Sequence, residues 1–319
     1  MGIAPAADAA PTAVPRARRL PIRRVDLIGY LFISPWLIGF IVFTLGPFLA
    51  SLFMSFTNWQ VIGNWRFIGL ANYAKMLSGQ DDIFIQALKV TVIYSLIRVP
   101  VGQVIALALA TLLNQRIVAR PFFRTIFYLP AVVDSAATAY LWQTVFSNQS
   151  GFVNNFLKIF GITGPNWLYS VEWSLYTLII ISLWNVGTSM LIYLAALQGV
   201  PESLHEAAMI DGAGVWARFR YVTVPMITPA IFFNLVLGFI GSFQVFTAAF
   251  IITNGGPGYS TTFYILYLYR TAFQDLQMGY ASALAWFLFV IIMTLTVIQI
   301  TLSRRWVYYE GESQPPAGR

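Results

Sequence analysis

The stretch YASALAWFLFVIIMTLTVIQITL, residues 280–302, decides the fold class because it contains no charged side chain. A helix needs about 20 apolar residues to cross the roughly 30 Å hydrocarbon core of a membrane, and this run is long enough. The rest of the chain agrees: 58% of its 319 residues are hydrophobic, only 10% are charged, and the mean hydropathy is +0.70. Because a soluble domain carries about 25% charged residues, the composition excludes a soluble enzyme.

Five further runs of similar length predict an all-α integral membrane protein with six transmembrane helices. The predicted spans are residues 27–55, 87–113, 122–146, 173–197, 226–252 and 280–302. The first is too long for the apolar part of a signal peptide and no Ala-x-Ala cleavage pattern follows it, so we interpret it as a retained span. Residues 1–26 form a basic tail that is predicted to be disordered, residues 27–305 form the membrane domain, and residues 306–319 form a C-terminal tail.

The distribution of positive charge predicts that both termini are cytoplasmic, because short loops rich in Arg and Lys stay on that side of a membrane. Four basic segments fall on one side of a six-span chain: residues 16–24, 116–124, 218–220 and 304–305. The opposite, external side consists of the longer segments 58–86, 148–172 and 253–277. In the first of these we expect a short surface helix at 71–77, and we expect Asp81 and Asp82 to cap a helix.

Residue content limits the chemistry that the chain could perform. It has no Cys and one His, which excludes a disulfide framework, a thiolate metal site and a His cluster. It also lacks the G-x-x-x-x-G-K-[ST], G-x-S-x-G and H-E-x-x-H patterns. We therefore predict no catalytic residue, no bound cofactor and no metal site. The basic residues form short clusters rather than one basic face, so nucleic acid is not an expected partner.

The cytoplasmic segment 198–225 has the pattern of two short helices rather than of a solvated loop. The first is marked by a starting proline, a capping-box pair, two helix-favouring alanines and a terminating glycine: Pro201, Ser203 with Glu206, Ala207 with Ala208, and Gly212. The second, at 213–222, carries Trp216 and Phe219 on one side. Two interpretations stay open: a hairpin resting on the bilayer, or a docking element anchored by this aromatic pair.

Within that segment, EAAMIDG at 206–212 is followed after nine residues by VTVP at 222–225. This resembles the EAA motif of the permease subunits of binding-protein-dependent ABC importers, with Val222 and Val224 replacing Ile and Leu. Other short matches are similar to the carbohydrate-uptake branch, which includes maltose and glycerol-phosphate permeases. They are WNVG at 184–187, LAALQ at 194–198, DGA at 211–213, TNGGP at 253–257 and GYASA at 279–283.

The resemblance implies a type I ABC importer permease fold in a bacterial or archaeal cytoplasmic membrane. This chain would hydrolyse nothing; a separate ATPase dimer would use ATP and Mg. A homologous second permease would complete the pore, and an external solute-binding protein would deliver a sugar or related solute. The resemblance also implies that the segment 198–225 docks on the ATPase, through Ser203, Glu206, Ala207, Ala208, Asp211, Gly212, Trp216 and Phe219.

The spans contain polar and aromatic side chains that could line a sugar pathway, because sugars offer hydroxyls to hydrogen bond and C–H faces to stack on rings. The predicted set is Asn185 and Thr188 in the fourth span and Asn234, Ser242, Gln244 and Phe246 in the fifth. The alternative is that these side chains only pack helices together.

Arg98 and Asp134 are the charges that lie farthest from any predicted loop. Antiparallel neighbouring helices would bring them to one level, where a lone charge costs about 2.5 to 3.5 kcal/mol. We predict a mutual ion pair; the rivals are that Asp134 faces the sugar cavity and that Arg98 snorkels. Asp134 could also serve an ion-coupled secondary transporter, but one intramembrane acid and no obvious inverted repeat argue against that class.

Overall fold

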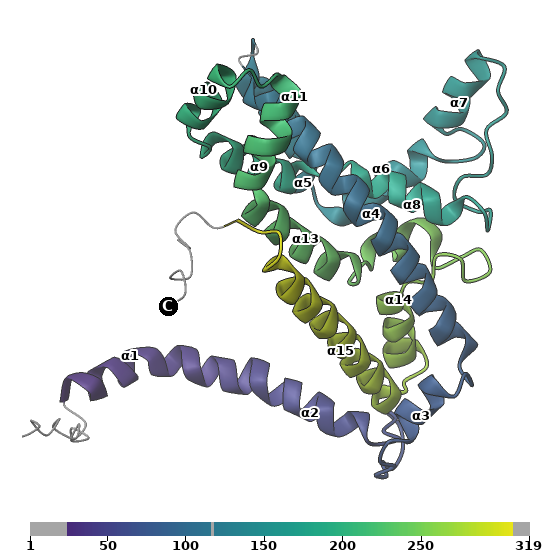
Figure 1. The fold of residues 1–319 in the computed structure, drawn as a ribbon. Coiled ribbons are helices and arrows are strands. Elements are labelled where there is room, and N and C mark those ends of the chain that lie inside the picture. The colour runs from purple at the N-terminus through teal and green to yellow at the C-terminus, as the bar shows by residue number, and fades with distance from the viewer. Residues whose placement is uncertain (1–23, 116–117, 309–319) are drawn as a thin grey trace, which may run out of the picture. The chain divides into compact units, whose positions relative to one another are not determined.

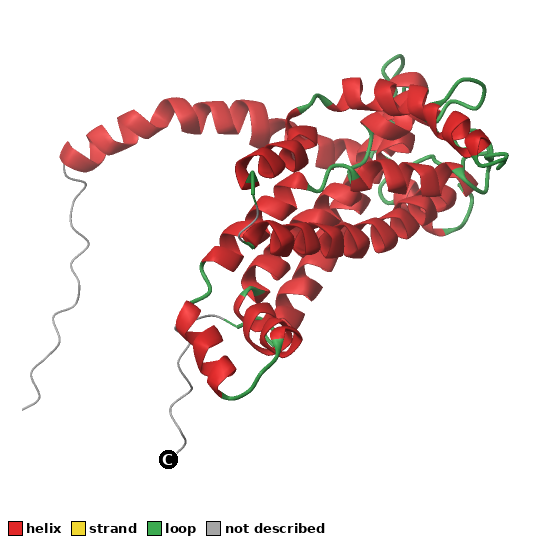
Figure 2. Ribbon diagram, turned by 90° about the horizontal axis from the view of Figure 1, so that it is seen from above, coloured by secondary structure: helices red, strands yellow, loops and turns green. Residues whose placement is uncertain are grey.

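The computed structural model describes residues 24–115 and 118–308, and every regular element in these ranges is a helix (Figures 1 and 2). The chain divides into two compact units, residues 1–51 and residues 52–319. The predicted tails lie outside the described residues, except for residues 24–26 at the start of the first helix and 306–308 after the last.

The first unit is a continuous helical stretch that carries on into the second. It comprises α1 (Arg24–Phe40), the π-helical turn η1 (Ile41–Leu45) and the start of α2 (Gly46–Ser55). The part from Ile28 to Ser55 is long and apolar enough to cross a membrane, and none of its most apolar window is buried within the protein. The continuous helix predicted at 27–55 is therefore present and is long enough to span a membrane.

The second unit contains the remaining helices and three more π-helical turns. In chain order they are α3 (Ala71–Leu77), α4 (Asp82–Asn114), α5 (Arg120–Val132), α6 (Ser135–Val145), α7 (Phe152–Ile159), α8 (Ser174–Leu183), α9 (Gly187–Gln198), α10 (Glu202–Ile210), α11 (Val215–Arg218), η2 (Phe219–Thr223), α12 (Val224–Met226), α13 (Thr228–Ser242), η3 (Ala249–Thr253), α14 (Tyr264–Tyr269), η4 (Arg270–Gln274) and α15 (Met278–Ser303).

The predicted spans correspond to helices of two kinds. Besides 28–55, α4 and α15 are each long and apolar enough to cross a membrane without a break. Two further candidates are bent pairs: α8 with α9 at 42°, and Val215–Met226 with α13 at 66°. The described residues thus give three unbroken spans, or up to five if each bent pair counts as one.

The predicted third span, 122–146, is wrong as a single helix. It consists of α5 and α6, of 13 and 11 residues, separated at Val133 and Asp134. Val133 is extended (ψ 138°), and the Asp134 carboxylate accepts hydrogen bonds from the N–H groups of Ala136 and Ala137 at the start of α6. An aspartate favours the N-cap position, because its side chain satisfies backbone donors that have no partner in the first helical turn.

Helix α4 is the element around which the second unit packs. It contacts α8, α9, α13 and α14, and its buried side chains belong to three successive apolar clusters. In Figure 1, α10 and α11 lie near the C-terminal end of α4, whereas α3 lies at the opposite end of the unit beside the start of α15. The two ends of α4 therefore mark the predicted cytoplasmic and external ends of this unit.

The segments predicted to be external contain more regular structure than the sequence suggested. The short helix predicted at 71–77 is confirmed as α3. The segment 253–277, predicted as an external loop, instead contains the end of η3, α14 and η4, with Thr261, Tyr264 and Leu266 fully buried. The threonine hydroxyls of this segment bond to its own backbone and side chains, which allows a polar stretch to pack inside the protein.

A buried carboxylate joins four elements at the predicted external end. Asp81 caps α4 through the N–H of Phe84, as predicted, and its other oxygen accepts hydrogen bonds from the hydroxyls of Tyr267 and Tyr280. The Lys75 ammonium lies 4.2 Å from the centre of the Tyr280 ring. Burial raises the pKa of Asp81, but the hydroxyls, the N–H group and the Lys75 charge outweigh it, so the pKa is lowered from 3.8.

We expect Asp81→Ala to lower the free energy of unfolding by about 3 kcal/mol, because two buried hydroxyls and a helix start lose a charged acceptor. The adjacent Asp82 is exposed, so Asp82→Ala is the matched control and should cost at most about 1 kcal/mol. Chemical unfolding in detergent micelles measures both; equal losses would contradict the role of Asp81.

The charge of Asp81 gives this prediction a second readout, the pH dependence of stability. Because the folded state favours the ionised carboxylate, the stabilisation by Asp81 is present above pH 3.8 and is lost as the pH falls through its folded pKa. The difference in unfolding midpoint between the wild type and Asp81→Asn should therefore shrink as the pH approaches that range. A difference independent of pH would show that the charge of Asp81 does not matter.

Candidate functional site

A polar cavity of about 310 Å³ lies where α4, α9 and α13 meet. It sits beside two interruptions of the helices: residues 184–186 between α8 and α9, and residues 243–246 after α13. Its walls are Tyr94, Arg98, Asn185, Thr188, Ser189, Ile192, Asn234, Leu237, Gly238, Gly241, Ser242 and Val245. Amides, hydroxyls and one guanidinium thus face one space inside an otherwise apolar protein.

Four of the six side chains predicted to line a pathway lie on this cavity: Asn185, Thr188, Asn234 and Ser242. Asn185 and Thr188 are exposed and available to a solute. Asn234 and Ser242 are buried and already engaged, Asn234 with the carbonyl of Ser189 at 3.4 Å and Ser242 with that of Phe239 at 2.8 Å. Asn234 and Ser242 thus agree with the alternative packing role, whereas Asn185 and Thr188 present exposed polar groups to the cavity.

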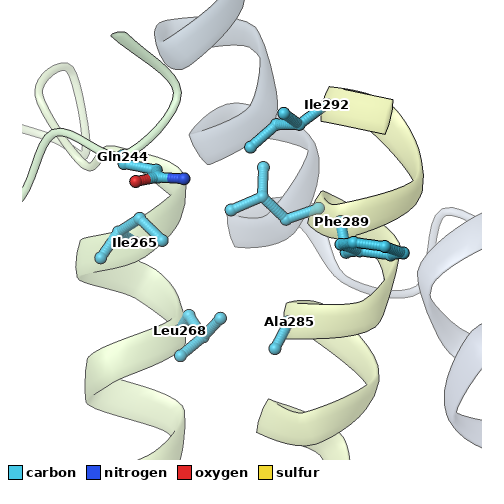
Figure 3. A pocket seen from close by; sticks show the side chains of 7 residues that line it. Gln244, Ile265, Leu268, Ala285, Phe289 and Ile292 are labelled. Carbon is cyan, nitrogen blue, oxygen red and sulfur yellow. The ribbon is translucent and has the colours of Figure 1, made fainter. Parts of the chain in front are cut away.

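The other two predicted pathway residues do not lie on this cavity. Gln244 points into a different, mainly apolar pocket of about 460 Å³ between α14 and α15, lined also by Ile265, Leu268, Ala285, Leu288, Phe289 and Ile292 (Figure 3). Phe246 stacks on Phe250, with ring centres 5.2 Å apart, and contacts Tyr269. The break after α13 separates these two residues from Ser242, which a continuous fifth span would not have done.

The predicted ion pair between Arg98 and Asp134 is not formed in the described part of the chain. Asp134 is exposed and caps α6, whereas Arg98 is half-buried and lines the polar cavity. The prediction counted depth along a continuous third span, and the break at Asp134 invalidates that count. Asp134 is also absent from the lining of this cavity, so the rival placement of that residue in the sugar cavity finds no support.

Sequence reasoning missed Tyr94, Ser189 and the network behind them. Tyr94 lies one helical turn before Arg98, so both share one face of α4. Behind the cavity, the Gln103 amide donates to the carbonyl of Asn234 at 3.1 Å and accepts from the Tyr193 hydroxyl at 2.7 Å. A signal was available, because Tyr94, Arg98 and Gln103 are polar side chains within one apolar helix.

The N-terminal end of α9 lies at the cavity. Its N-cap residue, Val186, has no side chain that could accept a hydrogen bond, so no side chain caps this end. The N–H groups of the first helical turn have no partner within a helix and give it a partial positive charge. Close packing holds this end in place: an added Cβ on Gly187 would lie 2.5 Å from the carbonyl oxygen of Phe127 in α5.

The predicted coupling segment forms a helical hairpin, with α10 followed by a helical stretch from Val215 to Met226. Gly212 adopts the left-handed conformation, as predicted (φ 80°). The N–H of Ala213 donates to the carbonyl of Ala208 and the N–H of Gly212 to that of Met209, which is the Schellman arrangement at a helix C-terminus. Gly212 therefore sets the direction in which the chain leaves α10.

The predicted capping box is wrong. Helix α10 begins at Glu202 after an extended Pro201, and no side chain caps it. Ser203 therefore lies inside the first turn rather than at the N-cap, where the Ser203–Glu206 pair could have closed a box. Proline fixes φ near the value needed just before a helix, and Glu202 places a negative charge near the positive helix end, so this start needs no serine cap.

The hairpin exposes large apolar side chains. Ile210 is 87% exposed, Trp216 75% and Tyr221 76%. The predicted anchors differ: Trp216 is exposed while Phe219 is half-buried, and their rings stack with centres 5.6 Å apart. The other residues of the predicted docking set, Ser203, Glu206, Ala207, Ala208, Asp211 and Gly212, lie on the same hairpin. An exposed apolar patch of this kind is typical of a surface that binds a partner.

The hairpin is connected to the rest of the protein by an amide between two arginines. Gln198 ends α9, and with its amide oxygen directed towards α5 it accepts hydrogen bonds from Arg124 at 2.7 Å and Arg120 at 2.9 Å. Helix α9 thus runs from the polar cavity at one end to the hairpin at the other, and it contacts α5 near both ends.

Comparison with known proteins places this arrangement in a transport family. Residues 99–308 match the family described as binding-protein-dependent transport system inner membrane component. The chain is 44% identical over 297 residues to the probable ABC transporter permease protein YesP of Bacillus subtilis (strain 168), a match that covers 92% of this chain and 96% of YesP. It is 35% identical over 289 residues to the lactose transport system permease protein LacF of Rhizobium radiobacter, covering 88% and 96%.

A solved structure has a similar fold. The bacterial alginate ABC transporter, in complex with an alginate pentasaccharide-bound periplasmic protein, contains a chain that superimposes with a TM-score of 0.78 at 26% sequence identity. The match covers 88% of this chain and 96% of that chain. The described helices therefore have the type I ABC importer permease fold.

Proposed function

We propose that this chain, which belongs to the family of binding-protein-dependent transport system inner membrane components and is a permease subunit of an ABC importer, carries a sugar or related solute across the inner membrane. The observation that carries the proposal is the polar cavity beside breaks in the helices. The relatives differ in the charge of what their names say they transport: lactose is neutral, whereas alginate is an acidic polysaccharide.

The cavity suits a sugar because it offers amides and hydroxyls from three helices. Asn185 and Thr188 present polar atoms at the start of α9, and Tyr94 offers a ring and a hydroxyl from α4. Irregular backbone in a membrane is tolerated where it faces a wet cavity, and such broken helices commonly form solute sites in transporters. The volume of about 310 Å³ is at the lower end of the range for small-molecule sites.

The hairpin of α10 and α11 is the proposed contact with a separate cytoplasmic ATPase dimer, which would bind ATP and Mg²⁺. Support comes from its exposed apolar side chains, and from the route through Gln198 and α9 to the cavity. Movement of the hairpin would thereby reach the wall of the cavity. A homologous second permease would supply the rest of the pore.

The proposed topology has six spans and cytoplasmic termini, with α5 and α6 together crossing as the third span. The external solute-binding protein would then dock on the side that bears segments 58–86 and 148–172 and the buried segment 253–277. The alternative of an ion-coupled secondary transporter lacks support, because its candidate coupling acid, Asp134, is occupied as a helix cap.

We expect Gly212→Ala to weaken coupling, because a left-handed φ costs a residue with a side chain about 1 to 2 kcal/mol. Gly214→Ala is a matched control: both glycines have open space around an added Cβ, but only Gly212 has a positive φ. Binding-protein-stimulated ATPase activity of the reconstituted complex should fall several-fold in the first variant alone. Normal activity in both would contradict the coupling role of this hairpin.

Trp216→Ala should lower the affinity of the complex for its ATPase subunits by at least tenfold, as expected for a large exposed anchor. The stability of the permease itself should not change, because Trp216 is exposed. Copurification of the ATPase at graded salt and detergent measures the loss. Retention of full affinity would assign the aromatic pair to the lipid surface instead.

We expect Asn185→Ala to lower sugar uptake in proteoliposomes by about tenfold, because a solute hydroxyl loses its partner in the cavity. Basal ATPase activity and assembly should remain. Gln244→Ala is the comparison variant, since Gln244 lies on the separate apolar pocket and its variant should transport normally. The reverse pattern would move the pathway to that pocket.

A further inference from the structure

We propose that the cavity selects solutes with one negative charge, and that Arg98 binds the carboxylate of an acidic sugar during passage. This inference rests on the proposed function and names its substrate class. It comes from the position of Arg98, the residues around it and the charge that they leave unbalanced.

Arg98 lies at the middle of α4, sixteen residues from each of its ends at Asp82 and Asn114. At 1.5 Å per residue this is about 24 Å from either end of the helix. A cation at such depth is costly unless it has a counter-charge or a wet cavity, and intramembrane charges of this kind commonly mark solute pathways. Its half-buried side chain lines the polar cavity, which supplies the wet surroundings.

No protein counter-charge balances Arg98 within the described part of the chain. None of the residues that line the cavity is acidic, and Arg98 forms no ion pair with another described residue. Its near neighbour is the hydroxyl of Tyr94, which interacts with the guanidinium but is neutral. The positive charge therefore faces the cavity without a partner of opposite sign among these residues.

The start of α9 adds to the positive potential at the same place. Asn185 and Thr188, on either side of that start, line the cavity, and no side chain caps the helix end. A helix N-terminus carries a partial positive charge, and half-helix N-termini in broken transporter helices face anionic groups of the solute. The guanidinium and the helix end are independent features that favour the same charge.

The composition of the cavity indicates a carboxylate rather than a phosphate ester. Arg98 is the single formal charge among the lining residues, which matches a singly charged carboxylate better than a doubly charged phosphate. The amide of Asn185 and the hydroxyls of Thr188 and Ser189 remain for sugar hydroxyls. The predicted solute is therefore a uronic acid or a short oligosaccharide that contains one.

The test measures binding to the importer complex in lipid nanodiscs without the solute-binding protein, so that the specificity of that protein does not enter. The probes are galacturonate, which carries one carboxylate, its carboxyl-reduced neutral form galactose, and galactose 6-phosphate. The variants are Arg98→Gln, which removes the charge, and Arg98→Lys, which keeps it. Arg66→Gln makes the same change at an exposed arginine outside the cavity and is the matched control.

We expect the wild-type complex to bind galacturonate at least tenfold more tightly than galactose. Arg98→Gln should remove this preference, while Arg98→Lys retains most of it and Arg66→Gln leaves it unchanged. Equal binding of both sugars by the wild type, or a preference that survives Arg98→Gln, overturns the proposal. Tighter binding of galactose 6-phosphate overturns the assignment to a carboxylate.

Two further measurements distinguish a failure of the charge preference from a failure of the proposed function. If Arg98→Gln fails to assemble, the comparison of the three probes on the wild type and on Arg98→Lys still decides the charge preference. ATP-driven uptake by the complete importer, with its binding protein, tests the proposed function. Uptake of neutral sugars alone would overturn the charge preference and leave the permease function intact, whereas uptake of neither class would contradict the proposed function itself.

Discussion

Backbone N–H and C=O groups in a hydrocarbon core have no water to bond with, and this constraint governs where the helices of the chain can stop. The bent pair α8 and α9 is interrupted at residues 184–186, and α13 ends before residues 243–246. Both interruptions border the polar cavity, and Asn185 and Ser242 lie on its wall. The polar cavity and the helix breaks are thus one feature, because irregular backbone within a membrane needs polar surroundings and the breaks border the cavity that supplies them.

The hairpin of α10 and α11 follows from ordinary helix-end chemistry. The extended Pro201 precedes α10. At the other end, left-handed Gly212 allows the N–H groups of Gly212 and Ala213 to donate to carbonyls of the last helical turn. These two helix ends orient the surface of the hairpin, whose large apolar side chains are exposed within the described part of the chain. Helix α9 connects this surface to the polar cavity.

Much of the fold could be predicted from the sequence because long apolar runs and cap residues are local signals. The helices at 27–55, 71–77 and 280–302, the cap at Asp81 and the left-handed Gly212 are confirmed. Breaks within apolar runs were harder to predict. At 122–146, 173–197 and 226–252 hydropathy continues through the break, because cavity walls and helix interfaces are both partly apolar.

The same difficulty affected the prediction of the site. Gln244 and Phe246 were placed on the wrong side of the end of α13. The pairing of Arg98 with Asp134 depended on counting depth along a continuous helix, and the break at Val133 invalidates that count.

The contacts of α9 with α5 have a mechanical consequence. Backbone meets backbone at Gly187, and the Gln198 amide meets Arg120 and Arg124 eleven residues later, about 16 Å along the helix. Contacts at two separated points along α9 restrict its rotation and translation relative to α5. Helices α9 and α5 are therefore held together as one stiff body that has Thr188 on the cavity wall at one end and Gln198 beside the hairpin at the other.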